Sequence, residues 1–366
     1  MLILFIITLV LVIYYFSSNY NESLLENFYD INLYKCPRLN VNQIHSKIIQ
    51  KYNIKRINNI EKCNIYIPCG YNNVENELKK VKLYNNTQKI YGISGCDFIV
   101  SKNGIWNLIE SRYGRHNAQK LMPETFVLNN PQHIELFKKT FNKNNIYLLK
   151  KNIQRKLGIE LSSNLNFILS KINTNFKIVQ KYIPNLYLVN KRKINLRLYL
   201  LIVCKNKKVK TYLHKLGKCI YTNKDIDYSN NFDKEKHLTS LNLNKNVYKT
   251  RPETFCELKK YLGNKKYRLL FNNIYKNLTY VIKSFHNKIC KLDNIENNLS
   301  FQLFGLDYIF DNKMNVYLLE MNKGPDMSIK SLNDPYTKEK VLTDVFKLTN
   351  VIIDDHTKNL FNEITF

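Results

Sequence analysis

Acidic residues are scarce in this chain of 366 residues, because 29 Asp and Glu stand against 57 Lys and Arg, a formal net charge of +28. A field of this sign attracts polyanions, which include nucleic acid, anionic lipid, nucleotide phosphates and acidic protein tails. Glycine and alanine are also scarce, whereas Asn, Ile, Lys and Tyr are abundant along the whole chain. Because this bias is uniform, it reflects genomic base composition more than function, and charge alone does not rank the partners.

The cysteines include no CxxC pair, which argues against a zinc site. Their scattered placement is typical of reduced, mostly buried thiols in a reducing compartment. The chain also lacks internal repeats and long linkers rich in Pro, Gly or Ser, and its length suits two or three subdomains. The eight cysteines are Cys36, Cys63, Cys69, Cys96, Cys204, Cys219, Cys256 and Cys290.

Residues 1–18 carry no charged side chain, and they have neither the basic start nor the A-x-A-like cleavage site of a signal peptide. The apolar run is slightly shorter than the roughly 20 residues that span a bilayer. We therefore predict an uncleaved N-terminal membrane anchor, with a buried N-terminal helix as the alternative. The residues that follow are acidic, so the positive-inside signal for orientation is weak.

Two carboxylates, Asp307 and Glu320, lie within the apolar runs of "LFGLDYIFDNKMNVYLLEMNK", residues 303–323. These runs have the pattern of buried strands. A buried carboxylate without a partner costs several kcal/mol or shifts its pKa until it is neutral. The sequence therefore predicts that something cationic meets both side chains.

Residues 311–314 ("DNKM") predict a tight turn, so the two runs form a β-hairpin. If Phe310 pairs with Asn315, Asp307 lies opposite Leu318, and the two carboxylates are diagonal neighbours on one face. Such neighbours lie about 7 Å apart at the backbone, within reach of one shared ion. A change of register by one residue would place them on opposite faces.

Asp307, Glu320 and Asn322 offer hard oxygen ligands, which suit Mg²⁺ bridged to substrate phosphates. The alternative is that both carboxylates form structural ion pairs with some of the many lysines and arginines. Spacing alone leaves both interpretations open.

Four further segments carry polar residues in places that suit nucleotide binding. Lys150 ends a strand-like run, where an ammonium holds phosphate oxygens, and a second run ends in residues 180–183, a hinge whose backbone meets an adenine. Alternation in "KRKINLRLYLLIV" separates a polar face from an apolar face. The residues so placed are Lys150; Gln180, Lys181, Tyr182 and Ile183; Lys193, Asn195, Arg197 and Tyr199; and His237 and Thr239 from "HLTSLNLNK".

In this order, the segments resemble the tubulin–tyrosine ligase-like family, a branch of the ATP-grasp ligases, over roughly residues 95–350. The family's F-G-x-D … L-L-E-x-N is present as FGLD and LLEMN, its K-F-D-x-R-x-Y as KINLRLY, and its H-L-T-N-Y-S-I-N-K as HLTSLNLNK. The hinge Q-x-Y-I stands as QKYI and P-x-T-F/Y-V-L as PETFVL, and a helix-start lysine matches Lys102. Each motif is weak alone, and their order carries the resemblance.

The resemblance implies an ATP-grasp fold of mixed α+β or α/β class, in which two α+β subdomains enclose ATP. These would be a central subdomain, residues 101–183, and a C-terminal subdomain with the metal-binding hairpin, residues 184–366. A smaller N-terminal domain, residues 46–100, would precede them, after the anchor helix and a polar tether, residues 19–45.

The resemblance also implies an ATP- and Mg²⁺-dependent carboxylate–amine ligase, which adds Glu, Gly or Tyr to a protein carboxylate through an acyl-phosphate. The implied metal ligands are Asp307, Glu320 and Asn322, and the implied catalytic residues are Arg197, Lys193 and His237. The implied nucleotide-binding residues are Lys102, Lys150, Gln180, Lys181, Tyr182, Ile183, Lys193, Asn195, Thr239 and Asn322.

The chain departs from the family pattern at four places. The family's glycine-rich phosphate loop is replaced by "KKNIQRKLGIEL", which has only Gly158. The Asp of K-F-D-x-R is Asn195, the Asn of H-L-T-N is Ser240, and an expected arginine falls at Ile220. These changes affect the prediction of substrate and of activity, but they do not touch the predicted metal ligands.

The implied partners are a free amino acid and an acidic protein or peptide acceptor, a tubulin-like tail among them. We expect the anchor to hold the catalytic body at a membrane on the cytosolic side, where ATP and reduced thiols are found. The composition is similar to that of ligase relatives from large DNA viruses or protists. The alternative function is an inactive module that binds nucleotide or an acidic partner. Nucleic acid is not expected, because the cations are spread through every segment and no recognition motif is present.

Overall fold

The computed structural model describes residues 32–34, 43–68, 74–152, 158–226, 232–353 and 357–366. Its strands are β1 (Asn32–Tyr34), β2 (Lys55–Ile57), β3 (Ile65–Tyr66), β4 (Lys89–Tyr91), β5 (Thr125–Val127), β6 (Tyr147–Lys151), β7 (Ile159–Ser162), β8 (Phe176–Lys181), β9 (Leu188–Val189), β10 (Arg192–Lys205), β11 (Lys208–His214), β12 (Lys218–Tyr221), β13 (Ser300–Phe310), β14 (Val316–Lys323) and β15 (Phe361–Glu363). Its helices are α2 (Gln43–Lys51), α3 (Val74–Lys80), α4 (Cys96–Ile99), α5 (Lys102–Tyr113), α6 (Arg115–Leu121), α7 (Pro131–Thr140), α8 (Leu165–Leu169), α9 (Lys234–His237), α10 (Phe255–Phe285) and α11 (Lys340–Leu348), with short turns η1 (Lys245–Lys249), η2 (His286–Lys288), η3 (Asp293–Ile295) and η4 (Pro335–Glu339).

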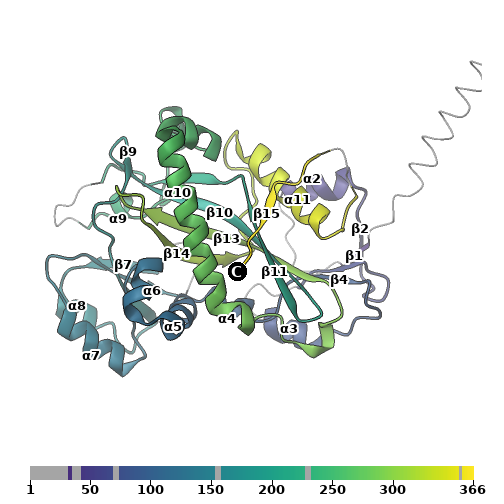
Figure 1. Ribbon diagram of the computed structural model, residues 1–366, viewed down its shortest axis with the longest axis horizontal. Coiled ribbons are helices and arrows are strands. Elements are labelled where there is room, and N and C mark those ends of the chain that lie inside the picture. The colour runs from purple at the N-terminus through teal and green to yellow at the C-terminus, as the bar shows by residue number, and fades with distance from the viewer. Residues whose placement is uncertain (1–31, 35–42, 69–73, 153–157, 227–231, 354–356) are drawn as a thin grey trace, which may run out of the picture.

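The described strands form two sheets, as the mixed α+β pattern of the sequence predicts. The large sheet has the order β15-β11-β10-β13-β4-β3-β1-β2, with β12 and β9 paired to β10 and β14 paired to β13. The N-terminal strands join it through β4, which pairs in parallel with β13. The small antiparallel sheet, β5-β8-β6-β7, carries α7 and α8 and lies beside the large sheet (Figure 1). The domain limits expected from the sequence stay predictions.

The two faces of β10 differ as the alternation of its residues predicts. Ile194, Leu196 and Leu198 are buried in the largest apolar cluster, together with residues of α10 and β13. The other face carries Lys193, Asn195, Arg197 and Tyr199, which line a cavity. Beyond Tyr199 this second face becomes apolar, and it packs against α11 through a separate cluster. One face of β10 therefore belongs to the hydrophobic core, and the other face lines the cavity with polar side chains.

The long helix α10 crosses one face of the large sheet (Figure 1). It begins with a capping box, in which the Thr254 hydroxyl accepts from the Glu257 amide at 3.3 Å and the Glu257 carboxylate accepts from the Thr254 amide at 3.0 Å. A kink at Gly263, with φ 76° and ψ 159°, separates its first two turns from the rest, and only glycine adopts such a conformation readily. Leu270, Ile274 and other apolar residues then bury one side of the helix on the sheet.

The predicted hairpin exists, but its predicted register was wrong. Phe310 pairs with Val316 instead of Asn315, because the Asp311 carboxylate accepts from the backbone amides of Lys313 and Asn315, both at 2.9 Å, and holds a wider turn. An irregularity next to Asp307 then shifts the pairing by one more residue. As a result, Asp307 lies directly opposite Glu320, and the two carboxylates still share one face.

Two further expectations concern the cysteines and the N-terminal residues. Cys204 and Cys290 form a disulfide, so the expectation that all cysteines are reduced was wrong, whereas Cys63, Cys96 and Cys219 are buried free thiols. The expected anchor, residues 1–18, lies outside the described residues and stays a prediction. Within the described part of the chain, no helix is both long and apolar enough to cross a bilayer.

Candidate active site

A cavity of about 1230 Å³ opens between the small sheet and the polar face of the large sheet. Residues from α5, β6, β8, β10, β13 and β14 form its walls, although Lys102 and Asn322 lie 220 positions apart in the sequence. Every residue predicted for the site lines it: Lys102, Lys150, Gln180, Lys181, Tyr182, Ile183, Lys193, Asn195, Arg197, His237, Thr239, Asp307, Glu320 and Asn322.

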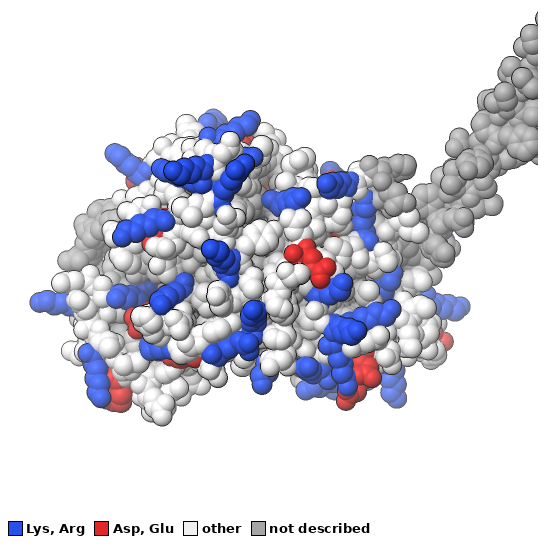
Figure 2. Space-filling model, in the orientation of Figure 1, with Lys and Arg blue, Asp and Glu red and all other residues white. Residues whose placement is uncertain are grey.

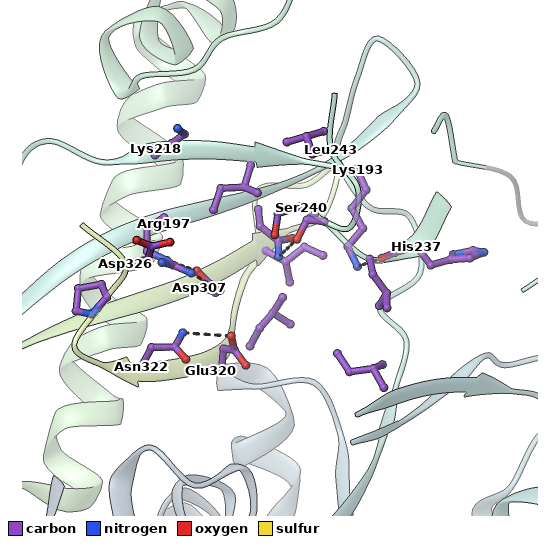
Figure 3. Close-up of a pocket in the computed structure, with 18 of the residues that line it drawn as sticks. Lys193, Arg197, Lys218, His237, Ser240, Leu243, Asp307, Glu320, Asn322 and Asp326 are labelled. Atoms are coloured by element: carbon purple, nitrogen blue, oxygen red, sulfur yellow. Dashed lines mark hydrogen bonds and ion pairs between the residues drawn. The ribbon is translucent and has the colours of Figure 1, made fainter. Parts of the chain in front are cut away.

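Four ionisable residues form one row across neighbouring strands of the large sheet. Strand pairing places Lys218 of β12 opposite Arg197 of β10, Arg197 opposite Asp307 of β13, and Asp307 opposite Glu320 of β14. Residues opposite one another in adjacent strands point to the same face. The row therefore runs from two cations to two carboxylates along one wall of the cavity (Figure 3).

Arg197 and Asp307 form a bidentate ion pair at the centre of this row. The Arg197 Nε and Nη2 atoms donate to the two Asp307 carboxylate oxygens at 2.6 and 3.0 Å. Burial acts to lower the pKa of Arg197, but the Asp307 carboxylate outweighs it and raises the pKa above the ordinary value. Gly305 makes room for this arginine, because a Cβ atom there would lie 3.2 Å from Arg197 Cδ and 3.0 Å from Pro325 Cβ.

Glu320 stays ionised although its side chain is only 31% exposed. Burial alone would raise its pKa, but the ammonium groups of Lys102 and Lys150, the amide of Asn322 and the Arg197 guanidinium lower it to about 2. The Asn322 amide donates to Glu320 Oε1 at 3.2 Å, and Lys102 Nζ lies 3.7 Å from Glu320 Oε2. The prediction that cations lie beside both carboxylates is thus confirmed by the geometry.

Lys102 reaches this carboxylate from the start of α5. Ser101 caps the helix by accepting from the Gly104 amide at 3.1 Å. A Cβ atom on Gly104 would lie 2.3 Å from Ser101 Oγ and 2.4 Å from the Phe98 carbonyl oxygen, so this tight turn requires glycine. The local sequence "SKNG" thereby fixes where the Lys102 side chain enters the cavity.

Lys150 belongs to β6 of the small sheet, and a chain of hydrogen bonds holds its side chain. Its Nζ donates to Gln180 Oε1 at 2.6 Å, and the Gln180 amide donates to Thr125 Oγ1 at 2.9 Å. Burial lowers the pKa of Lys150 to about 8, with Lys102 adding to the effect and Glu320 and Asp307 opposing it. Lys150 therefore titrates close to physiological pH in the absence of a bound anion.

We expect the affinity of the chain for ATP without Mg²⁺ to fall above pH 8. A phosphate beside Lys150 favours its charged form, so binding takes up a proton wherever the free lysine is neutral, and affinity falls by up to about tenfold per pH unit there. Lys150→Arg keeps a charge at all these pH values and should remove the dependence. Titration calorimetry from pH 7 to 9.5 measures both quantities, and a flat profile for the wild type would contradict the assignment.

The remaining predicted residues form the polar wall near the hinge. Lys193 Nζ donates to the His237 carbonyl at 2.9 Å and lies 4.8 Å from the centre of the Tyr182 ring. The Asn195 amide donates to Thr239 Oγ1 at 2.9 Å, whereas Asn195 Oδ1 is buried and has no hydrogen-bond partner among the described residues. A buried acceptor without a donor is costly, so this oxygen fits a ligand hydroxyl such as that of a ribose.

The donor set also fits Mg²⁺, since two carboxylates that face each other and a nearby amide supply hard oxygen ligands. In the part of the chain that the structure describes, no cluster of three His, Cys, Asp or Glu side chains is arranged for a metal. The third protein ligand would therefore be the Asn322 amide oxygen. Metal binding by these residues stays a prediction.

The sequence did not predict a second ionic cluster, which surrounds Lys218 at the end of the row opposite Glu320. Lys218 Nζ lies 2.9 Å from Glu253 Oε1, 2.8 Å from Asp334 Oδ1 and 3.0 Å from Ser331 Oγ. Lys338 Nζ lies 3.2 Å from the other carboxylate oxygen of Asp334, Oδ2. Desolvation acts to raise the pKa of Asp334, but the hydrogen bond and charge of Lys218 lower it below its ordinary value. The cluster joins β12, the start of α10 and residues 331–338 around one end of the cavity.

Comparison with known proteins agrees with the geometry. The sequence model of the Tubulin-tyrosine ligase family matches residues 78–359. A probable beta-tubulin polyglutamylase of Tetrahymena thermophila is 27% identical over 293 residues, which cover 72% of this chain and 24% of that protein. Probable tubulin polyglutamylase ttll-9 of Caenorhabditis elegans is 25% identical over 48% of this chain and 42% of its own length, and Tubulin glycylase 3B of Drosophila melanogaster is 26% identical over 50% and 26%. The chain thus spans less than half the length of these relatives.

Proposed function

Because the chain belongs to the tubulin-tyrosine ligase family, we propose that it is an ATP- and Mg²⁺-dependent ligase that joins an amino acid to a protein carboxylate. In this reaction the γ-phosphoryl group of ATP passes to a carboxylate, which releases ADP and leaves an acyl-phosphate. The amine of the incoming amino acid then attacks the acyl carbon, an amide bond forms, and inorganic phosphate leaves. The amino acid would be Glu, Gly or Tyr.

One observation carries the proposal: Asp307 and Glu320 lie opposite each other on adjacent strands, with Lys102 and Lys150 close to Glu320, in the wall of a cavity large enough for a nucleotide. Such a site holds phosphates between fixed cations and a pair of acids that can bind the charge-neutralising Mg²⁺. Phosphoryl transfer needs mainly this positioning and electrostatic stabilisation. A structural ion pair alone would not require four converging elements around an open space.

The other residues have roles in the same proposal. Residues 180–183 would hold the adenine at the end of β8, and Asn195 and Thr239 would meet the ribose or the phosphates. Lys193 would bind phosphate oxygens, with His237 on the same side. Arg197 would orient the acyl-phosphate or the acceptor carboxylate through its planar, two-pronged donors.

The acceptor in this proposal is an acidic protein segment, and a tubulin-like tail is one example. Three of the similar proteins are named as tubulin polyglutamylases or glycylases. The net charge of +28 would guide an acidic acceptor toward the cavity. We also retain the proposal that residues 1–18 anchor the body at the cytosolic side of a membrane.

The test is an assay of the full chain with Mg-ATP, an acidic acceptor such as purified tubulin, and radiolabelled Glu, Gly or Tyr. We expect ADP release that depends on both acceptor and amino acid, with one label transferred per ADP. ATP binding without ADP release from any combination would favour the nucleotide-binding module instead. Absence of ATP binding would mean that the two carboxylates serve only as structural ion pairs.

A further inference from the structure

A buried chain of hydrogen bonds crosses the small sheet and ends at Lys150. Strand pairing places Thr125 of β5 opposite Gln180 of β8, and Gln180 opposite Leu148 of β6, two residues before Lys150. The side chains of these residues therefore share one face of the sheet. Gln180 and Lys150 line the cavity, whereas Thr125 is fully buried and does not line it. Thr125 is thus a polar residue with no contact to a ligand in the cavity, and its role lies in what it does to Gln180.

The ammonium group of Lys150 depends on protein atoms for its charge. Figure 2 shows Lys and Arg side chains on the outer surface, where water stabilises their charges. Lys150 is only 7% exposed, and the charged groups around it oppose one another, since Lys102 lowers its pKa and Glu320 and Asp307 raise it. The Gln180 amide oxygen accepts from Lys150 Nζ at 2.6 Å. This neutral acceptor stabilises the ammonium and occupies one of its three N–H donors, so the others can point to a ligand.

Thr125 determines which end of the Gln180 amide faces Lys150. A hydroxyl has one proton, and Thr125 Oγ1 lies 2.7 Å from the carbonyl oxygen of Pro123, which can only accept. The proton therefore lies in this contact, and Thr125 Oγ1 accepts from the Gln180 amide nitrogen at 2.9 Å. The amide oxygen is then left for the ammonium. A reversed amide would place its NH₂ group against the ammonium, donor against donor, and its oxygen against a hydroxyl whose proton is already used.

The sequence supplies the fixed end of this chain within three residues. Pro123 has a restricted backbone dihedral φ, and its carbonyl lies two residues before Thr125, within reach of the hydroxyl. The Thr125 carbonyl accepts from Arg115 Nη2 at 2.9 Å, which holds the backbone of the threonine from a second side. The direction of the hydrogen bonds is therefore set by the protein before a ligand enters the cavity.

We propose that Thr125 is a positioning residue, which orients the Gln180 amide so that its oxygen holds the Lys150 ammonium for the phosphates of ATP. The identity of the ligand rests on the proposed function, but the orientation of Gln180 does not. Loss of the hydroxyl removes the acceptor of the amide nitrogen, and the amide then turns between two orientations, one of which presents its NH₂ group to Lys150. The charged form of the lysine is stabilised less, and phosphate binding weakens.

The experiment compares Thr125→Val with Thr125→Ser in the full chain. Valine has nearly the shape of threonine but no hydroxyl, whereas serine keeps the hydroxyl. Protonation of Lys150 is followed in the free protein by trace acetylation with acetic anhydride from pH 6 to 10, and fragment ions in mass spectrometry separate Lys150 from Lys151. We expect the midpoint of reactivity to fall by about one pH unit in Thr125→Val, as for the loss of one hydrogen bond to a charged group, and to stay near the wild-type value in Thr125→Ser.

Binding of ATP without Mg²⁺, measured by titration calorimetry at pH 7.5, gives the second readout. We expect affinity to fall about tenfold in Thr125→Val and less than about twofold in Thr125→Ser. Thr211→Val is a matched control, because Thr211 is also a fully buried threonine of a strand, its hydroxyl donates to the Ile364 carbonyl at 3.3 Å, and it does not line the cavity. This control should change neither the affinity nor the midpoint for Lys150.

Gln180→Met tests whether Thr125 acts through the amide, because methionine has a similar size but no group to orient. In this background Thr125→Val should change the affinity and the midpoint no further. The same loss in both backgrounds would overturn the proposal, and so would a midpoint that is unchanged in Thr125→Val. If the wild type binds no ATP while the midpoint still falls in Thr125→Val, the nucleotide site is refuted and the orientation of Gln180 by Thr125 is not.

Discussion

Glu320→Gln is expected to reduce ADP release and amino-acid transfer at least about a thousandfold, because the side chain is a proposed ligand of the charge-neutralising ion. Glutamine has nearly the same shape, so the cavity keeps its form, but the charge that faces Lys102 and Lys150 is lost. Binding of ATP without Mg²⁺ should persist or strengthen, since two cations lose a competing carboxylate. The enhancement of ATP binding by Mg²⁺ should disappear, and this is the measurement that separates metal binding from a structural role.

Glu110 provides a matched control for this variant. It is also a carboxylate with a cationic neighbour, since Arg115 lies 2.7 Å from Oε1, and His133 lies 3.1 Å from Oε2, but it does not line the cavity. Glu110→Gln should lower the free energy of unfolding by about 1–3 kcal/mol and leave turnover unchanged. If Glu320→Gln instead lowers stability as Glu110→Gln does, with the Mg²⁺ response intact, Glu320 is a structural partner of Lys102.

The shared face of the polar residues of β10, and the cations beside Asp307 and Glu320, could be predicted because their pattern is local. Alternation in β10 fixes which side chains share a face, and two acids inside apolar runs require cationic neighbours whatever the details of pairing. The structure places Arg197 and Lys102 as those neighbours. The alternation of side chains along a strand and the free-energy cost of burying a charge therefore allow these residues of the cavity wall to be predicted from the sequence.

The register of the hairpin could not be predicted, because it depends on which backbone amides the Asp311 carboxylate binds. Asp311 binds two backbone amides within the turn and displaces the pairing by one residue, and the irregularity beside Asp307 displaces it by another. Each shift alone would put the two acids on opposite faces, and together they restore a shared face. Nothing in the residue types of 303–323 distinguishes these pairings before the turn forms.

The Lys218 cluster could not be predicted for a different reason. Its acids, Glu253 and Asp334, come from segments 35 and 116 residues away from Lys218 along the chain. Such contacts depend on tertiary packing and leave no spacing in the sequence. Ser240 gives a local contrast, since its φ of 57° lies in the left-handed region, which explains why the family pattern has Asn, a residue that tolerates this conformation, at that position.

Arg197→Gln is expected to cost about 3–5 kcal/mol of stability as well as transfer activity, because it leaves the Asp307 carboxylate buried without its two-pronged partner. Arg197 and Asp307 side chains are only 19% and 11% exposed, so water screens the lost pair weakly. Urea unfolding monitored by circular dichroism measures the change in free energy. An unchanged midpoint would show that the pair contributes nothing to folding.

Combining Arg197→Gln with Asp307→Asn separates the two roles of the arginine. The double variant has no uncompensated charge, and the two amides can bond each other, so most of the stability should return. Transfer should stay at least about a hundredfold below the wild type, because neither an orienting guanidinium nor the carboxylate of the row is restored. If activity returns together with stability, Arg197 only holds the strands in place. If stability returns alone, Arg197 and Asp307 take part in the reaction in addition to holding the two strands together.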